Sequence, residues 1–184
     1  MQKLSKWILK TAGWKLVVTV GEPKKSVICV APHTSNWDYP LGQLFYWSLG
    51  RKASFLIKKS WFVFPLNFVF NALGGVPVDR NKRTSVTQQM ADEFDKRETF
   101  HLAVTPEGTR SLVDKWKMGF YNIAIKANVP IQLAYFDYAK KEMGITVVFY
   151  PTGDEKADLA KIQEYYKDVT AKFPERFNLH VNKQ

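Results

Sequence analysis

The sequence predicts a single-domain α/β protein, and three observations support this prediction. Short apolar runs alternate along the chain with segments of helical periodicity, which is typical of strands covered by helices. The 184 residues suit one domain that is large enough to bury a substantial core. No internal repeat, low-complexity tract or long linker divides the chain, so we expect one domain over residues 1–184.

The first 20 residues predict an amphipathic segment that contacts a membrane. Leu4, Trp7 and Ile8 share one helical face, and lysines surround that face. This pattern is typical of a short helix that lies in a membrane interface. It is equally typical of an amphipathic helix packed on its own domain, and the sequence leaves both alternatives open.

The next elements follow from apolar runs and their terminators. Residues 27–31 predict a buried strand that Pro32 stops, and a helix over about 36–49 closes at Gly50. Residues 53–57 predict a second strand. The stretch 61–78 carries no charge, but its apolar part before Gly74 is too short to cross a bilayer. We therefore expect an apolar helix over 61–73, either buried or dipping into lipid, and then a short extended piece over 76–78.

The second half continues the alternation. The following elements are expected: a helix over 85–97 with Ser85 and Gln88 as capping box, a strand over 101–104, a helix that Asn128 ends, strands over 131–136 and 145–149, and a last helix opened by a capping box of Thr152 and Glu155. The helix before Asn128 shows one apolar face, made by Phe120, Ile123, Ala124 and Ala127.

Charge and cysteine content restrict the class of partner and compartment. The formal net charge is +10, which favours anionic partners such as phosphate headgroups, acidic lipid surfaces or nucleic acid. The single Cys29 has no partner for an intrachain disulfide, so a reducing compartment fits. No stretch predicts a secretory signal or a convincing transmembrane helix. We expect a peripheral protein on the cytoplasmic face of the cell membrane.

A histidine and a carboxylate lie close together in the stretch APHTSNWDYP. On a regular helix, His33 and Asp38 would lie about 140° apart, on different faces. Ser35 and Asp38 also fit a helix capping box, which would give the carboxylate a structural role. If His33 stands in the loop before the helix, however, it can fold back onto the carboxylate. That arrangement fixes the imidazole tautomer and leaves one ring nitrogen free as a base.

Two further stretches can bind a phosphate. Arg80 follows the sequence Gly-Gly-Val-Pro-Val-Asp, and with Lys82 and Arg83 it makes three cations within four residues. Glu107 and Arg110 lie in Thr-Pro-Glu-Gly-Thr-Arg-Ser, a turn that follows an apolar strand. Taken singly, each stretch is also an ordinary surface turn. No zinc-binding, Rossmann, P-loop or nucleophile-elbow motif occurs, and neither a metal nor a cofactor is expected.

The order of these stretches resembles the glycerolipid acyltransferase family. His-x-x-x-x-Asp at 33–38, GGVPVDR at 74–80, PEGTRS at 106–111 and Val-Pro-Ile at 129–131 match the four sequence blocks of that family, and Phe-Leu-Ile-Lys-Lys at 55–59 resembles its basic segment. The resemblance implies a mixed β-sheet flanked by helices, as in glycerol-3-phosphate acyltransferase. It also implies site residues: His33 as general base, Asp38 as its orienting partner, and Arg80, Glu107, Gly108, Thr109, Arg110 and Lys58 as substrate-binding residues.

By this resemblance, the expected reaction is acyl transfer from an acyl thioester to the free hydroxyl of a lysophospholipid. The donor is acyl-CoA or acyl-ACP, so acyl carrier protein is a candidate partner beside the lipids and the anionic membrane surface. The favoured acceptor is 1-acylglycerol-3-phosphate, which would give phosphatidic acid. Pro32 stands where the family usually has asparagine, and a lyso-aminolipid acceptor is the alternative. Further alternatives are a lipid or thioester hydrolase with the same residue pair, a basic nucleic-acid-binding protein and a non-enzymatic membrane-binding protein. A nucleic-acid-binding protein would fit the charge but leaves the block order unexplained, so no nucleic-acid partner is expected.

Overall fold

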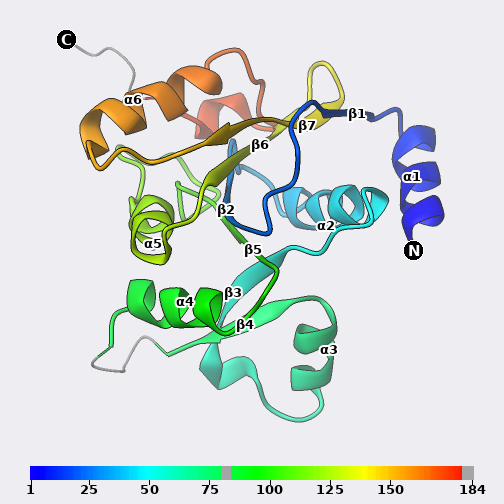
Figure 1. Cartoon of the computed structure of the whole chain (residues 1–184). Coiled ribbons are helices and arrows are strands. Elements are labelled where there is room, and N and C mark those ends of the chain that lie inside the picture. The colour runs from blue at the N-terminus through cyan, green and yellow to red at the C-terminus, as the bar shows by residue number, and fades with distance from the viewer. Residues whose placement is uncertain (80–83, 180–184) are drawn as a thin grey trace.

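One mixed β-sheet forms the centre of the protein. The computed structural model describes residues 1–79 and 84–179. In this part of the chain, seven strands pair in the order β1-β7-β6-β2-β5-β3-β4 (Figure 1). The strands are β1 (Lys15–Val18), β2 (Lys25–Val30), β3 (Ser54–Lys58), β4 (Gly75–Val78), β5 (Phe100–Val104), β6 (Ile131–Asp137) and β7 (Glu142–Phe149). The paired strands are parallel except β6 and β7, which pair antiparallel.

Helices cover both faces of this sheet, which confirms the predicted fold class. The helices α1 (Gln2–Thr11) and α2 (Asp38–Ser48) pack on one face. The helices α4 (Val86–Asp95), α5 (Gly119–Ala127) and α6 (Glu155–Tyr165) pack on the other. The short helix α3 (Leu66–Ala72) lies beside β4 at the edge of the sheet (Figure 1). Two 3₁₀ turns, Lys59–Trp61 and Pro174–Arg176, complete the described elements.

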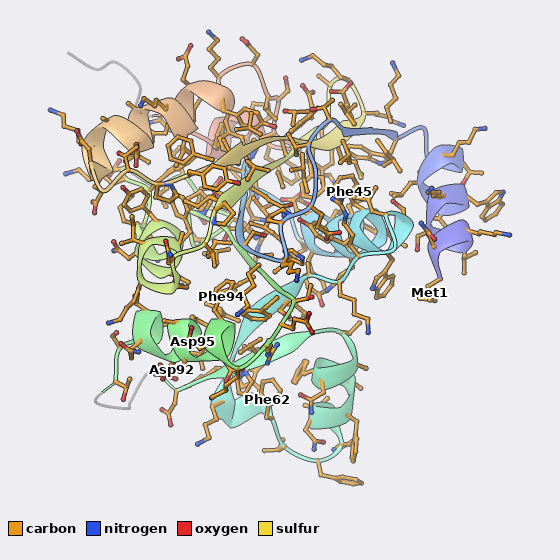
Figure 2. All side chains as sticks on the ribbon, in the orientation of Figure 1. Met1, Phe45, Phe62, Asp92, Phe94 and Asp95 are labelled. Carbon is orange, nitrogen blue, oxygen red and sulfur yellow. The ribbon has the colours of Figure 1, made fainter. Side chains whose placement is uncertain are left out.

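Successive apolar side chains of the central strands point to opposite faces of the sheet, and this produces two separate apolar cores. On β2, Val27 and Cys29 face the core under α4, α5 and α6, whereas Ile28 faces the core under α1 and α2. This division follows from the pleat, which points successive side chains to opposite faces. Figure 2 labels one buried aromatic from each core, Phe45 on α2 and Phe94 on α4.

Several predicted helix ends are confirmed by their local chemistry. The hydroxyl of Ser85 accepts a hydrogen bond from the backbone N–H of Gln88 and caps α4. Asn128 ends α5 in the left-handed conformation at φ 51°. Gly50 follows α2 at φ 74°, where a residue without Cβ is favoured.

The structure differs from the sequence analysis at several points. Residues 15–18 form β1, a strand that the sequence did not reveal because four residues give little periodicity and the strand depends on pairing with β7. The last helix is capped by Asp154, because Thr152 instead donates its backbone N–H and its hydroxyl to the buried carboxylate of Asp158. Ser35 does not cap α2, whose first helical residue is Asp38.

The apolar stretch 61–73 does not form one helix. It divides into the 3₁₀ turn that ends at Trp61 and the helix α3, with Pro65 at the start of α3. Most of its large apolar side chains remain exposed: Trp61, Val63, Phe64, Leu66, Phe68 and Val69. Within the described residues, no helix has the length and apolar character needed to span a membrane.

The helix α1 presents a split surface. Its side chains Ser5 and Leu9 are buried against the domain, and Leu9 belongs to the core under α2. Leu4 and Trp7, which the sequence placed on one helical face, remain exposed. The helix therefore packs on the domain and also keeps an apolar face toward solvent.

Candidate active site

The topology gathers the predicted residues at one edge of the sheet. Because β2, β3, β4, β5 and β6 run parallel, their carboxyl ends meet at the same edge, where α/β folds bind ligands. A cleft of about 1020 Å³ opens at this edge. Its charged and polar lining includes His33, Asn36, Asp38, Lys58, Thr105, Arg110 and Lys117. Its apolar lining includes Ile57, Trp61, Phe70, Leu73, Val78, Val86 and Val104.

His33 and Asp38 form a direct pair in this cleft. The Nδ1 atom of His33 lies 3.0 Å from Oδ2 of Asp38. The pair forms because His33 stands in the loop after β2, while Asp38 is the first residue of α2. The helical angle between positions five apart therefore does not apply.

The surroundings of Asp38 assign the imidazole tautomer. The Oδ2 atom also accepts hydrogen bonds from the backbone N–H groups of Thr34 and Ser35, and Oδ1 accepts one from the hydroxyl of Tyr138. An ionised carboxylate with these donors is an acceptor only, so Nδ1 of His33 must carry the proton that it shares with Asp38. The Nε2 atom then keeps its lone pair and can accept a proton from a substrate.

Half of the predicted capping box is present at this turn. Asp38 accepts from the backbone N–H of Ser35, as the N3 residue of a capping box does, while the hydroxyl of Ser35 accepts from the N–H of Trp37. The structural and chemical alternatives for Asp38 therefore do not exclude each other. The carboxylate shapes the turn and also contacts the imidazole.

Glu107 lies behind the cleft and supports the histidine loop. Its side chain is only 2% exposed, and Oε1 accepts a hydrogen bond of 2.8 Å from the backbone N–H of His33. The Oε2 atom is buried without a hydrogen-bond partner among the described residues. Burial raises the pKa of this carboxyl group above its usual value, since removal from water disfavours the charged form.

Three cations border the opening of the cleft. Lys58 ends β3, and Arg110 and Lys117 lie in the long loop that follows β5. Lys117 folds over Gly108, where φ is 64° and an added Cβ would lie 2.9 Å from the lysine Nζ. Glycine is favoured at this position by its positive φ, whereas the flexible end of the Lys117 side chain can shift away from an added Cβ.

The structure brings together most, but not all, of the predicted residues. His33, Asp38, Lys58, Gly108 and Arg110 all line the cleft. Thr109 is exposed and is absent from the described lining, and its Oγ1 accepts from the N–H of Ser111 at 3.4 Å. Arg80 lies outside the described residues. Val78, the last residue of β4, lines the cleft.

Sequence reasoning did not find Lys117 or Tyr138. Lys117 is one of several lysines in an irregular loop, and nothing in its spacing distinguishes it. Tyr138 lies two positions after the predicted strand 131–136 and directly after the observed β6, which is a position where site residues are common in parallel sheets. That signal becomes useful only when β6 is known to lie beside β2.

Four backbone N–H groups at the start of α2 already donate hydrogen bonds within the protein. The N–H groups of Thr34 and Ser35 bind Asp38, that of Trp37 binds the Ser35 hydroxyl, and that of Asp38 binds the Ser35 carbonyl. These four amides therefore do not offer free donors to a developing oxyanion. Among residues 1–79 and 84–179, no cluster of His, Cys, Asp and Glu side chains is arranged to hold a metal ion.

The fold and the cleft define a class of protein. An oriented imidazole beside cationic side chains, at the carboxyl ends of a parallel sheet, is equipped for general-base transfer chemistry on an anionic substrate. Comparison with known proteins specifies this class. The acyltransferase family profile matches residues 15–136, and the chain therefore belongs to the acyltransferase family. The protein is an acyltransferase.

Structural comparison agrees with the family assignment. No curated protein sequence shows significant similarity to the chain. The crystal structure of the 1-acyl-sn-glycerophosphate (LPA) acyltransferase, PlsC, from Thermotoga maritima is similar with a TM-score of 0.58 and 19% sequence identity. The similarity covers 89% of this chain and 74% of the Thermotoga maritima chain, and it shows that the two proteins share a fold.

Proposed function

We propose that this acyltransferase moves a fatty acyl group from an acyl thioester to the free hydroxyl of a lysophospholipid. The observation that carries the proposal is the orientation of His33. Its Nδ1 atom is fixed by Asp38 in a cleft that also presents Lys58, Arg110 and Lys117. The favoured acceptor is 1-acylglycerol-3-phosphate, the substrate named for the Thermotoga maritima enzyme.

The chemistry needs no covalent enzyme intermediate. The Nε2 atom of His33 takes the proton of the acceptor hydroxyl while the hydroxyl oxygen attacks the thioester carbonyl carbon. The tetrahedral intermediate collapses, the C–S bond breaks, and the leaving thiolate takes the proton back from the imidazole. A positioned base contributes about a hundred- to ten-thousand-fold to such a step.

The cations orient the acceptor. A phosphate group on the lysophospholipid can accept charge-assisted hydrogen bonds from the Arg110 guanidinium and from the ammonium groups of Lys58 and Lys117. This contact would hold the hydroxyl next to His33, so part of the rate enhancement comes from positioning. Arg80 remains a prediction for the same phosphate, on the basis of its sequence block.

The apolar rim of the cleft suits a lipid substrate. Trp61, Phe70 and Leu73 line the cleft and belong to the same segment as the exposed side chains of residues 61–69. Insertion of this segment into the leaflet, with Lys58 and Lys59 beside it, would place the cleft where the lipid lies. The protein would then act as a peripheral protein on an anionic membrane surface, on the cytoplasmic side.

Substitution of His33 tests the proposal. The purified His33→Ala protein should retain its circular dichroism spectrum and lose acyl transfer by about a hundred-fold or more. The assay offers lysophosphatidate and lyso-aminolipids, each with acyl-CoA and with acyl-ACP, and quantifies the acylated lipid by mass spectrometry. Turnover at the wild-type rate would remove His33 from the mechanism.

The same assay separates the alternatives. Release of free fatty acid at equal rates with and without a lyso-lipid would identify a hydrolase. A product formed only from lyso-aminolipids would move the acceptor assignment to that class. The acyl carrier protein would be the donor if acyl-ACP alone supports turnover.

A further inference from the structure

The carboxylate of Asp38 accepts a hydrogen bond from a residue that lies outside the family's sequence blocks. Its Oδ1 atom accepts a hydrogen bond of 2.5 Å from the hydroxyl of Tyr138, whereas the contacts from His33, Thr34 and Ser35 all go to Oδ2. Tyr138 directly follows β6 and lies beyond residues 15–136, the part of the chain that matches the family profile.

Tyr138 is itself anchored by distant parts of the chain. Its backbone N–H donates to the carbonyl of Thr170 at 2.9 Å. Its ring packs edge-on against Trp14, with the ring centroids 5.2 Å apart. The nearby N–H of Phe173 donates to the hydroxyl of Thr34 in the histidine loop. The segment that follows β6 and the segment at 170–173 together enclose the His33–Asp38 turn from outside the family region.

The Tyr138 hydroxyl can act as a donor over the whole working pH range. Burial, followed by the hydrogen bond to Asp38, raises the pKa of this phenol well above its usual value. The phenol therefore stays protonated, and the Asp38 oxygen that faces it remains a stabilised acceptor.

We propose that Tyr138 is a positioning residue for acyl transfer, which fixes the plane of the Asp38 carboxylate and thereby the orientation of the His33 imidazole. This inference rests on the proposed function. Rotation of the carboxylate about its soft terminal torsion would displace both oxygens. The donor on Oδ1 therefore adds a restraint on this torsion from the opposite side of the group to the contacts that already hold Oδ2. The same bond draws part of the carboxylate charge away from the imidazole.

Removal of the hydroxyl should change the chemical step and its pH dependence. In Tyr138→Phe, we expect kcat to fall about tenfold, the effect of one hydrogen bond to a charged group, while KM for both substrates stays within about twofold. The acidic limb of the kcat/KM profile should move to higher pH, because an Asp38 without its phenol donor stabilises the imidazolium more strongly. A purely structural role would lower the yield or the Tm and leave that limb in place.

Tyr121→Phe provides a matched control. Tyr121 also donates its hydroxyl to a buried carboxylate, Asp158, at 2.9 Å, and it is absent from the described lining of the cleft. Its loss should lower the Tm and leave kcat and the pH profile unchanged. An unchanged acidic limb in Tyr138→Phe, or an equal shift in Tyr121→Phe, would overturn the inference.

A double-mutant cycle shows whether Tyr138 acts through Asp38. In an Asp38→Asn background, Tyr138→Phe should cost much less than tenfold, because the carboxylate that it positions is gone. Fully additive losses would contradict the inference. Such a result would leave the proposed function intact as long as His33→Ala remains inactive, whereas turnover by His33→Ala would remove the proposed function itself.

Discussion

His33 is fixed by contacts to both its backbone and its ring. Glu107 accepts from its backbone N–H, and Asp38 accepts from its ring. These two carboxylates come from different segments, 69 positions apart by their numbers, and both approach the loop after β2. An imidazole held in this way needs little reorganisation before it accepts a proton, which is the physical basis of its proposed role.

At this scale, Glu107 takes an unexpected position. The family resemblance implies that it binds the acceptor, and the structure shows it buried beneath the histidine loop. Its role as an acceptor-binding residue stays a prediction. The observed hydrogen bond already gives the side chain a structural task next to the site.

Arg110 provides a test of the phosphate site. It is exposed, borders the cleft and makes no ion pair with a described residue. In Arg110→Ala, we expect KM for lysophosphatidate to rise about ten- to a hundred-fold, the cost of lost charge-assisted hydrogen bonds, with KM for the thioester changed less than twofold. Initial rates measured while each substrate is varied in turn give both constants.

Lys115→Ala is the control for this variant. It removes one positive charge from the same loop, but Lys115 is absent from the described lining of the cleft. Its kinetic constants should match those of the wild type. Equal increases of both KM values in Arg110→Ala would refute the assignment of Arg110 to the phosphate.

At the scale of elements, the segment of residues 61–69 exposes several large apolar side chains close together. Phe64 is 82% exposed and Phe68 is 64% exposed, and their rings pack edge-on against each other. An exposed apolar cluster beside a charged rim typically marks a contact surface. In Figure 1, the helix α3 of this segment lies beside β4 at the edge of the sheet.

Charge placed in this segment tests the proposed membrane contact. In Phe64→Asp/Phe68→Asp, we expect sedimentation with vesicles of mixed anionic and neutral lipid to fall at least tenfold, because each carboxylate opposes both insertion and attraction to anionic headgroups. Activity toward a lyso-lipid dispersed as monomers should change much less than activity toward the same lipid in vesicles.

Tyr150→Asp is the matched control for the membrane experiment. Tyr150 is 70% exposed, and it follows β7 rather than β3. Vesicle binding by this variant should stay at the wild-type level. Full binding by the double variant would show that residues 61–69 do not contact the bilayer.

At the scale of the whole molecule, a buried polar network joins three strands. The Nδ1 atom of His101 on β5 lies 2.8 Å from the hydroxyl of Ser26 on β2, which accepts from Gln132 on β6 at 3.0 Å. On its other side, the His101 Nε2 atom lies 3.3 Å from Glu22, which pairs with Arg51. Burial, and secondarily the nearby Arg51, lowers the pKa of His101 to about 4.

This shift makes folding stability depend on pH. A histidine in the unfolded chain has a pKa near 6.5. As the pH falls below that value, His101 binds a proton in the unfolded chain but remains neutral in the folded protein. The contribution of His101 is complete above about pH 6.5 and declines until the pH reaches about 4. Between pH 7 and pH 5, we expect the free energy of unfolding to drop by about 1–2 kcal/mol from this residue.

Urea denaturation at pH 7 and pH 5 measures this effect. The His101→Gln variant should be less stable at pH 7 and lose less stability on acidification than the wild type. The difference between the two proteins isolates His101, because their other titrating groups are the same. Identical losses in both proteins would show that His101 is protonated equally in the folded and unfolded states.

The sequence alone determined the α/β class, the order of most elements, the positions of β2 to β7 within a few residues and several of the residues that line the cleft. Strand and helix periodicities are local properties, and the caps at Ser85 and Asn128 depend on neighbouring residues only. The ordered motifs located His33, Asp38, Lys58 and Arg110 without any knowledge of their contacts. These residues all follow or border strands, where local pattern and site coincide.

Only the tertiary structure decided which distant groups complete the site. The strand order places β6 beside β2, and this brings Tyr138 to Asp38 across a hundred positions of sequence. The fold of the loop after β5 brings Lys117 over Gly108, and pairing with β7 makes a strand of residues 15–18. Such contacts depend on sheet order and loop path, which arise from packing of the whole chain and leave no periodic trace in the sequence.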